Sequence, residues 1–265
     1  MPPAKKRAQR TRSYDPAKIR AAVSAQFGHV RDAVLTLPEE ALDGPTRLGD
    51  WTVRELAGHL AWMVGAVPEL LARPEPAQRE LPLLEWPFAT AAAAGRIDEH
   101  TRALDTADLA ALYERTREAY ESALAGAQDT RLLPVSLGAM TLADFLVTRT
   151  VELVVHTDDL AAATGVAVPY DRQALAACTR LLCDALAAKA PGGAVEVRVP
   201  PYAVVQCVEG PRHTRGTPPN VVETDPLTWI RLATGRAGWA AELDAARVSA
   251  SGERADLSGL LPLMG

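Results

Sequence analysis

The sequence predicts an antiparallel four-helix bundle followed by a smaller, mixed α+β domain. Four segments in the first part of the chain carry apolar residues at helical spacing, and two of them begin with a clear capping motif. Farther along, the apolar residues alternate with polar ones, as in half-buried strands. With 265 residues the chain is long enough for two domains. We expect a disordered basic tail over residues 1–13, the bundle over 14–166 and the α+β domain over 167–265.

The first two helices of the bundle are marked by their N-terminal residues. Asp15 and Pro16 open a helix of about twenty residues, in which apolar side chains recur with the helical period. Thr52 and Glu55 form the T-x-x-E pattern of a capping box, which predicts that a second helix begins there. His59 then lies in the second turn of a helix with a well-defined start, so its position is fixed.

The other two helices follow a long connection. Residues 68–90 are rich in proline and are expected to be irregular, whereas residues 106–126 are predicted to be helical. Thr141 and Asp144 repeat the start signal as T-x-x-D, and Gly165 is suited to cap the C-terminus of this last helix. Four helices of this kind indicate an antiparallel bundle.

The remaining part of the chain mixes the two kinds of secondary structure. A long amphipathic helix is predicted first, and alternation of valine with charged residues then indicates a strand. The full set of expected elements is a helix over 171–189, strands over 195–199, 202–208, 220–223 and 247–251, and short helices over 225–234, 237–243 and 255–261.

Charge and composition exclude several classes of function. The net charge is −5 although the first twelve residues contain only basic charges, so an acidic body argues against nucleic-acid binding. No apolar stretch has the length of a membrane span or the pattern of a secretory signal. Three cysteines without a C-x-x-C pair fit buried thiols in a reducing compartment. We therefore expect a cytoplasmic protein.

The strongest candidate for chemistry lies in the fourth helix. Glu152 and His156 are four residues apart, so they lie on the same face, within a segment that is otherwise mostly apolar. A buried carboxylate needs a charged partner or a metal ion. The alternative is a polar surface stripe in which the two side chains form a weak pair.

His59, on an apolar face of the second helix, is the third candidate ligand. Two imidazoles and one carboxylate suit Zn²⁺ and leave one coordination position open, as in catalytic sites, although nickel, iron or manganese also fit this donor set. Asp159 is interpreted as an acid that supports a ligand or packs the helix, with a solvated carboxylate as an equal alternative. His29 and His100 are expected on the surface, and His213 in a polar loop.

Two segments carry a resemblance to a known family. The stretches GDWTVRELAGHL (49–60) and TVELVVHTDDL (150–160) resemble the mycothiol-dependent maleylpyruvate isomerase family, and residues 225–236 fit its C-terminal domain. The resemblance implies a DinB-like four-helix bundle that holds a divalent metal through His59, Glu152 and His156. It also implies that the C-terminal domain is sterol-carrier-like.

The resemblance further implies an enzyme that uses mycothiol, a low-molecular-weight thiol, as cosubstrate. The metal would convert the thiol into a thiolate, which adds to an electrophilic substrate and permits S-transfer or cis–trans isomerisation. Arg236 and Arg149 are candidate catalytic cations for an anionic substrate. Two other functions remain open: binding of a lipid or other apolar ligand with a structural metal, and metal-dependent hydrolysis.

Overall fold

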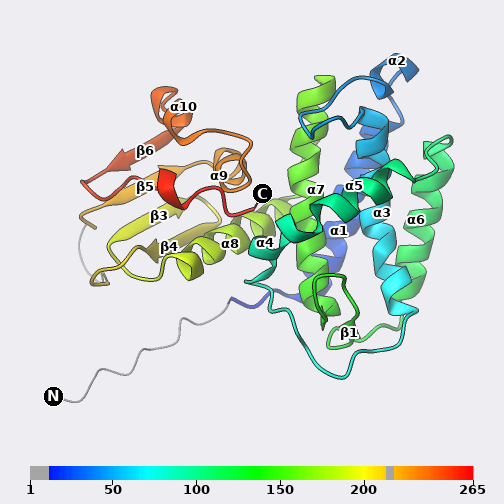
Figure 1. Ribbon diagram of the computed structural model, residues 1–265, viewed down its shortest axis with the longest axis horizontal. Helices are drawn as coiled ribbons and strands as arrows, with labels where there is room; N and C mark the ends of the chain where they lie inside the picture. Colours follow the sequence, from blue (N-terminus) through cyan, green and yellow to red (C-terminus); the bar gives the residue numbers. More distant parts are fainter. Residues whose placement is uncertain (1–11, 213–217, 265) are drawn as a thin grey trace.

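The computed structural model describes residues 12–212 and 218–264, and it divides into a helical part and a sheet-containing part (Figure 1). The predicted tail over 1–13 therefore lies almost wholly outside the described residues, as does His213. No helix in the described ranges is long and apolar enough to cross a membrane.

Four long helices among the described residues form the bundle, and the predicted fold class is confirmed. α1 packs on α7 and α3, and α3 packs on both α6 and α7. Their apolar faces form a common core with phenylalanine, tyrosine, leucine and valine side chains. The bounds of the helices are α1 Pro16–Val34, α3 Val53–Leu71, α6 Leu109–Leu124 and α7 Leu142–Thr164.

The helix starts are formed by the residues that predicted them. The side chain of Asp15 caps α1, and Thr52 and Glu55 make both hydrogen bonds of the capping box at α3. Thr141 accepts a hydrogen bond from the backbone N–H of Asp144 at the start of α7. Gly165 ends α7 in the left-handed conformation that glycine adopts without strain.

The connection between α3 and α6 differs from the prediction. α3 continues through Pro68 to Leu71, although proline removes one hydrogen bond and crowds the preceding turn, because the last turn buries Leu70 against the core. The irregular stretch is followed by short helices over residues that the sequence did not mark as helical. These elements, with the small α2 and a two-stranded ribbon, are α2 Glu39–Leu42, α4 Trp86–Ala89, η1 Thr90–Ala93, α5 Ala94–Arg102, β1 Leu132–Leu133 and β2 Met140–Thr141.

The second part contains a four-stranded sheet among its described residues, in the order β4-β3-β5-β6. β3 pairs antiparallel with β4 and parallel with β5, and β5 pairs antiparallel with β6. The elements are α8 Arg172–Lys189, β3 Val195–Val199, β4 Ala203–Cys207, β5 Val221–Thr224, α9 Pro226–Ala233, α10 Trp239–Asp244, β6 Val248–Ser251 and η2 Ser258–Leu260.

The last predicted helix, over 255–261, is wrong: only the short η2 turn forms. Pro262 disfavours a helical conformation at the residue before it, and Leu261 is extended.

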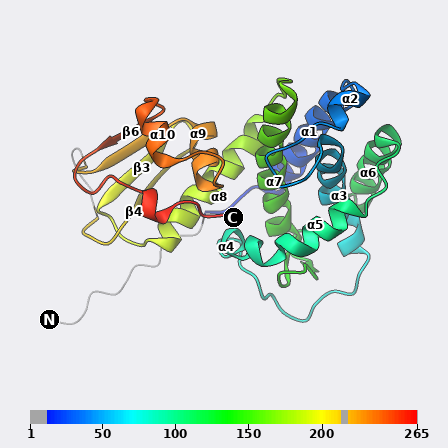
Figure 2. The ribbon, with the colours of Figure 1, turned by 45° about the horizontal axis from the view of Figure 1, so that its top comes forward.

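Helix α8 joins the two parts. It packs on α1 and α7 of the bundle and on β4 and α9 of the sheet-containing part, so it lies between them in both views (Figures 1 and 2). Its buried face includes Cys178 and Cys183, and Cys207 is buried on β4. All three thiols are free, and burial raises the pKa of each of them, which agrees with their predicted role as small apolar side chains.

Candidate metal centre

The structure brings His59, Glu152 and His156 together. One potential ligand atom from each residue lies within 4.8 Å of the other two, although His59 is on α3 and the other two are on α7. The rings of His59 and His156 meet edge to face, with centroids 4.9 Å apart. The Nε2 atom of His156 lies 3.3 Å from Oε2 of Glu152. The capping box of α3 and the packing of α3 on α7 set this geometry.

The two imidazoles have different surroundings. His59 is 2% exposed, and burial lowers its pKa to about 3. Its Nδ1 atom lies 3.2 Å from Oγ1 of Thr101, whereas its buried Nε2 atom has no hydrogen-bond partner. Because a neutral imidazole has one donor and one acceptor nitrogen, an Nδ1–H that donates to Thr101 leaves a lone pair on Nε2.

His156 is held by carboxylates on both sides. Its Nδ1 atom lies 2.8 Å from Oδ2 of Asp159, and Nε2 faces Glu152. Burial would lower the pKa of His156, but the hydrogen bonds to the two acids raise it above its ordinary value. Burial would likewise raise the pKa of Glu152, whereas the hydrogen bond from His156 and the charge of Arg149 hold it at about 2.

These contacts provide a test of whether the residues suit a metal ion. Nε2 of His59 is a buried lone pair without a partner, and Nε2 of His156 faces an ionised carboxylate. A proton on Nε2 of His156 would pair with Glu152 but would leave Nε2 of His59 without a partner. A divalent cation would satisfy both, because neutral imidazoles and carboxylates are the ligands found in zinc sites. The donor set therefore fits the predicted metal.

The two candidate cations occupy different places. Arg149 is buried on α7, where its guanidinium stacks on the ring of Phe145 at 4.4 Å and donates to Oγ1 of Thr148. Arg236 follows α9, and its hydrogen bonds go to the carboxylate of Asp159 and the carbonyl of Thr234. Arg236 therefore contacts the triad only through Asp159.

A network of arginine and aspartate residues links the triad to the second part of the chain. Asp159, which is fully buried, accepts hydrogen bonds from Arg236 and, at 2.5 Å, from Arg47 in the loop before α3. The neighbouring Asp158 pairs with Arg47 and with Arg231 of α9. Sequence reasoning missed Arg47 and Arg231, since each arginine is more than 70 residues from Asp158 in the sequence.

The sequence predicts His100 on the surface, and its side chain is exposed, but it also lines the cavity beside the triad. Its ring packs on Trp62 with a centroid distance of 4.3 Å. Thr101, the partner of His59, carries no signal in the sequence, because no apolar pattern marks α5 as a helix.

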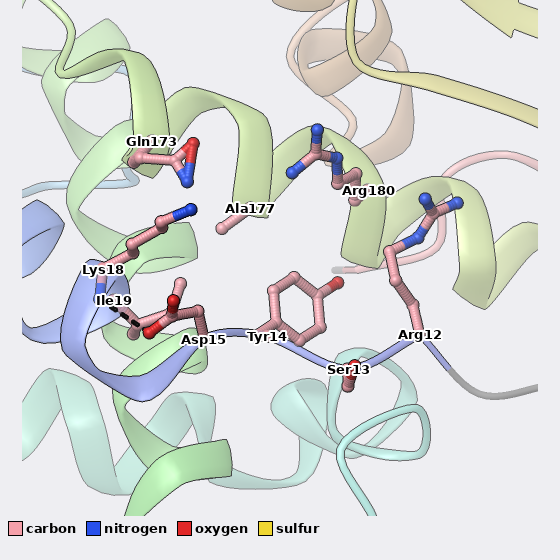
Figure 3. Close-up of a pocket in the computed structure, with 9 residues that line it drawn as sticks. All are labelled: Arg12, Ser13, Tyr14, Asp15, Lys18, Ile19, Gln173, Ala177 and Arg180. Carbon is pink, nitrogen blue, oxygen red and sulfur yellow. Dashed lines mark hydrogen bonds between the residues drawn. The ribbon is translucent and has the colours of Figure 1, made fainter.

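A second cavity, of about 310 Å³, lies where the chain before α1 crosses α8 (Figure 3). Lys18 and Gln173 reach toward each other across it, with Tyr14 and Arg180 nearby (Figure 3). This cavity shares no lining residue with the one beside the triad, so it does not extend the candidate metal centre.

The fold and the site define a helical bundle with a candidate metal triad, joined to an α+β domain. A family model described as the mycothiol maleylpyruvate isomerase N-terminal domain matches residues 9–161. This match covers more than half of the chain, and the protein therefore belongs to that family. A second model, described as a bacterial SCP ortholog, matches residues 171–263. No curated protein matches the chain.

Two solved structures share the fold over almost the whole chain. Both are described as mycothiol-dependent maleylpyruvate isomerase, one of them a mutant, and they align with TM-scores of 0.61 and 0.62 at 13% identity. Each alignment covers 95% of this chain and 97% of the solved one. This chain and the two solved structures therefore share both parts of the fold.

Proposed function

We propose that this protein is a divalent-metal-dependent enzyme that activates a low-molecular-weight thiol, mycothiol, for addition to an electrophilic substrate, with S-transfer or cis–trans isomerisation as the outcome. The observation that carries the proposal is the convergence of His59, Glu152 and His156 within 4.8 Å around an unpartnered imidazole nitrogen. The family match supports mycothiol as the thiol.

In the proposed enzyme, some residues hold the metal and others orient its ligands or bind the substrate. His59, Glu152 and His156 would hold the metal, for which Zn²⁺ fits the donor set. When bound, a divalent cation lowers the pKa of a coordinated thiol, so that the thiolate forms near neutral pH. Asp159 keeps the Nδ1 proton on His156 and thereby leaves Nε2 free as a ligand. Arg149 supplies a positive charge at the cavity for an anionic group.

The experiment combines metal analysis with turnover. We expect the purified protein to contain about one divalent metal per chain. We expect it to isomerise or conjugate an electrophilic substrate only when mycothiol is added. His156→Ala should lose the metal and the activity while the helices remain, as measured by circular dichroism. His29→Ala, on α1, is the matched control and should keep both.

The results also separate the alternative functions. Turnover without added thiol would favour a metal-dependent hydrolase. A co-purifying apolar ligand with no thiol-dependent turnover would favour a lipid-binding protein with a structural metal. A protein that is isolated without metal and does not bind zinc in a titration would contradict the proposal.

A further inference from the structure

The cavity beside the triad is a slot along α3. Its volume is about 330 Å³, which lies within the ~300–1,000 Å³ of small-molecule sites. The α3 side of the slot runs from His59 to Leu70, which corresponds to about 16 Å of helix at the usual rise per residue. Glu152 on α7 lines the same slot. The candidate metal centre therefore lies at one end of an elongated space.

The positive charge nearest the triad within this slot is Arg149. It lies one helical turn before Glu152 and is 8% exposed. Its hydrogen bonds go to the hydroxyl of Thr148, and among the described residues no carboxylate lies within ion-pair distance, although the charge of Glu152 acts on it from farther away. A buried guanidinium that has no directly hydrogen-bonded carboxylate favours an anion that can form this bond.

The walls of the slot farther from the triad are largely apolar. Met63, Ala66 and Leu70 line it from α3, and Phe145 lines it from α7. The opposite walls come from the segment around α4 and from the loop between β1 and β2, where they include Trp86, Ala93, Pro134, Val135 and Leu137. Arg73, the other cation in the lining, is exposed and lies beyond the end of α3.

We propose that the electrophilic substrate is a carboxylate with an apolar body, whose carboxylate is bound by Arg149 and whose body lies against the apolar walls. Arg149 is then the residue that determines specificity for the carboxylate of the substrate. This inference rests on the proposed function, because it names the substrate class of the same site. A compact dicarboxylate fits less well, since its second charge would lie against apolar side chains without a partner.

The test measures binding of three simple probes to the full chain by isothermal titration calorimetry. The probes are trans-cinnamate, cinnamyl alcohol and maleate, which represent an apolar carboxylate, its uncharged counterpart and a compact dicarboxylate. We expect cinnamate to bind at least about tenfold more tightly than either of the others, since charge-assisted pairing and apolar contact act together. Measurements with zinc-loaded and chelator-treated protein separate the contribution of Arg149 from that of a metal.

Substitutions test whether Arg149 causes the preference for cinnamate over cinnamyl alcohol. In Arg149→Met, cinnamate and cinnamyl alcohol should bind equally, whereas the matched control Arg73→Met should keep the preference for the acid. Val135→Asp places a carboxylate on a half-buried loop wall and should abolish cinnamate binding, which provides a second test if Arg149→Met does not fold. Melting curves and circular dichroism identify variants that are folded.

Maleate binding as tightly as cinnamate, or a preference for the acid that survives in Arg149→Met, would overturn the inference. The outcomes also distinguish it from the proposed function. If the chelator-treated protein selects cinnamate but shows no metal binding and no thiol-dependent turnover, the proposed function is refuted and the proposed ligand class is supported. If the protein is a zinc- and thiol-dependent enzyme that prefers maleate, the proposed function is supported and the proposed ligand class is refuted.

Discussion

Asp159 fixes the orientation of His156, because its Oδ2 atom lies 2.8 Å from Nδ1 of the imidazole one turn earlier on α7. Asp159 is fully buried, and although burial alone would raise its pKa, hydrogen bonds from His156 and Arg236 hold the pKa far below its ordinary value. The acid is therefore ionised and accepts a hydrogen bond from Nδ1–H of His156. This leaves Nε2, the nitrogen that faces Glu152, as the potential ligand.

Asp159→Asn should weaken zinc binding about 10- to 100-fold, the usual effect of removing a carboxylate that orients a ligating histidine. The amide cannot stabilise the tautomer as the carboxylate does. Competition with a chromogenic chelator measures the change. Asp158→Asn is the matched control: Asp158 pairs with Arg47 and Arg231 but not with His156, so zinc affinity should change little. Equal losses in both variants would contradict the role of Asp159.

The pH dependence of zinc binding should reflect His156 alone. Metal binding needs the neutral imidazole, and Asp159 and Glu152 raise the pKa of His156 in the metal-free protein. As the pH falls below that raised pKa, one proton must be displaced, so the apparent affinity should fall about tenfold per pH unit. His59 adds no proton, because burial lowers its pKa to about 3, and the pKa of Glu152 is about 2.

Zinc titrations across a range of pH measure this slope. Above the pKa of His156 the affinity should level off, since no proton then competes with the metal. A slope that corresponds to two protons would show that His59 is also protonated in the metal-free protein, and a flat profile would contradict the raised pKa of His156.

Arg236→Met should lower the free energy of unfolding by about 3 kcal/mol, the lower end of the cost of breaking a buried ion pair, because Arg47 still contacts Asp159. Denaturant unfolding measures the loss. Arg198→Met, which removes a partly exposed pair with Glu196 on the sheet, is the control and should cost less than about 1 kcal/mol. If both variants lose the same free energy, the link between the two parts of the chain is not a stabilising contact.

The parts of the fold that the sequence predicted are those formed by interactions between residues close together in the chain. The caps at Asp15, Thr52 and Thr141 are hydrogen bonds between residues two or three positions apart, so their pattern is visible in the sequence. The same holds for the spacing of Glu152 and His156 on one helix. His59 could be proposed as a third ligand because a histidine on an apolar helix face has few other reasons to be there.

The parts that the sequence did not predict depend on distant contacts. α5 buries only Thr101, so it has no apolar period, and its contacts include Thr101 with His59 and Asp98 with Trp51. Arg47 and Arg231 reach Asp158 from segments far apart in sequence. The pair with Arg47 follows from packing within the helical part, and the pair with Arg231 from packing of the second part against the bundle. A single sequence specifies neither.

Thr101→Val should weaken zinc binding about tenfold or more, because it removes the oxygen that accepts the Nδ1 proton of His59 while conserving the shape of the side chain. The buried N–H would then lack a partner, and the imidazole could turn its unprotonated nitrogen away from Glu152. Thr116→Val, at a buried position on α6, is the matched control, and its zinc affinity should stay unchanged. Unaltered affinity in Thr101→Val would show that the packing of Trp51 and Trp62 around the ring is sufficient to orient His59.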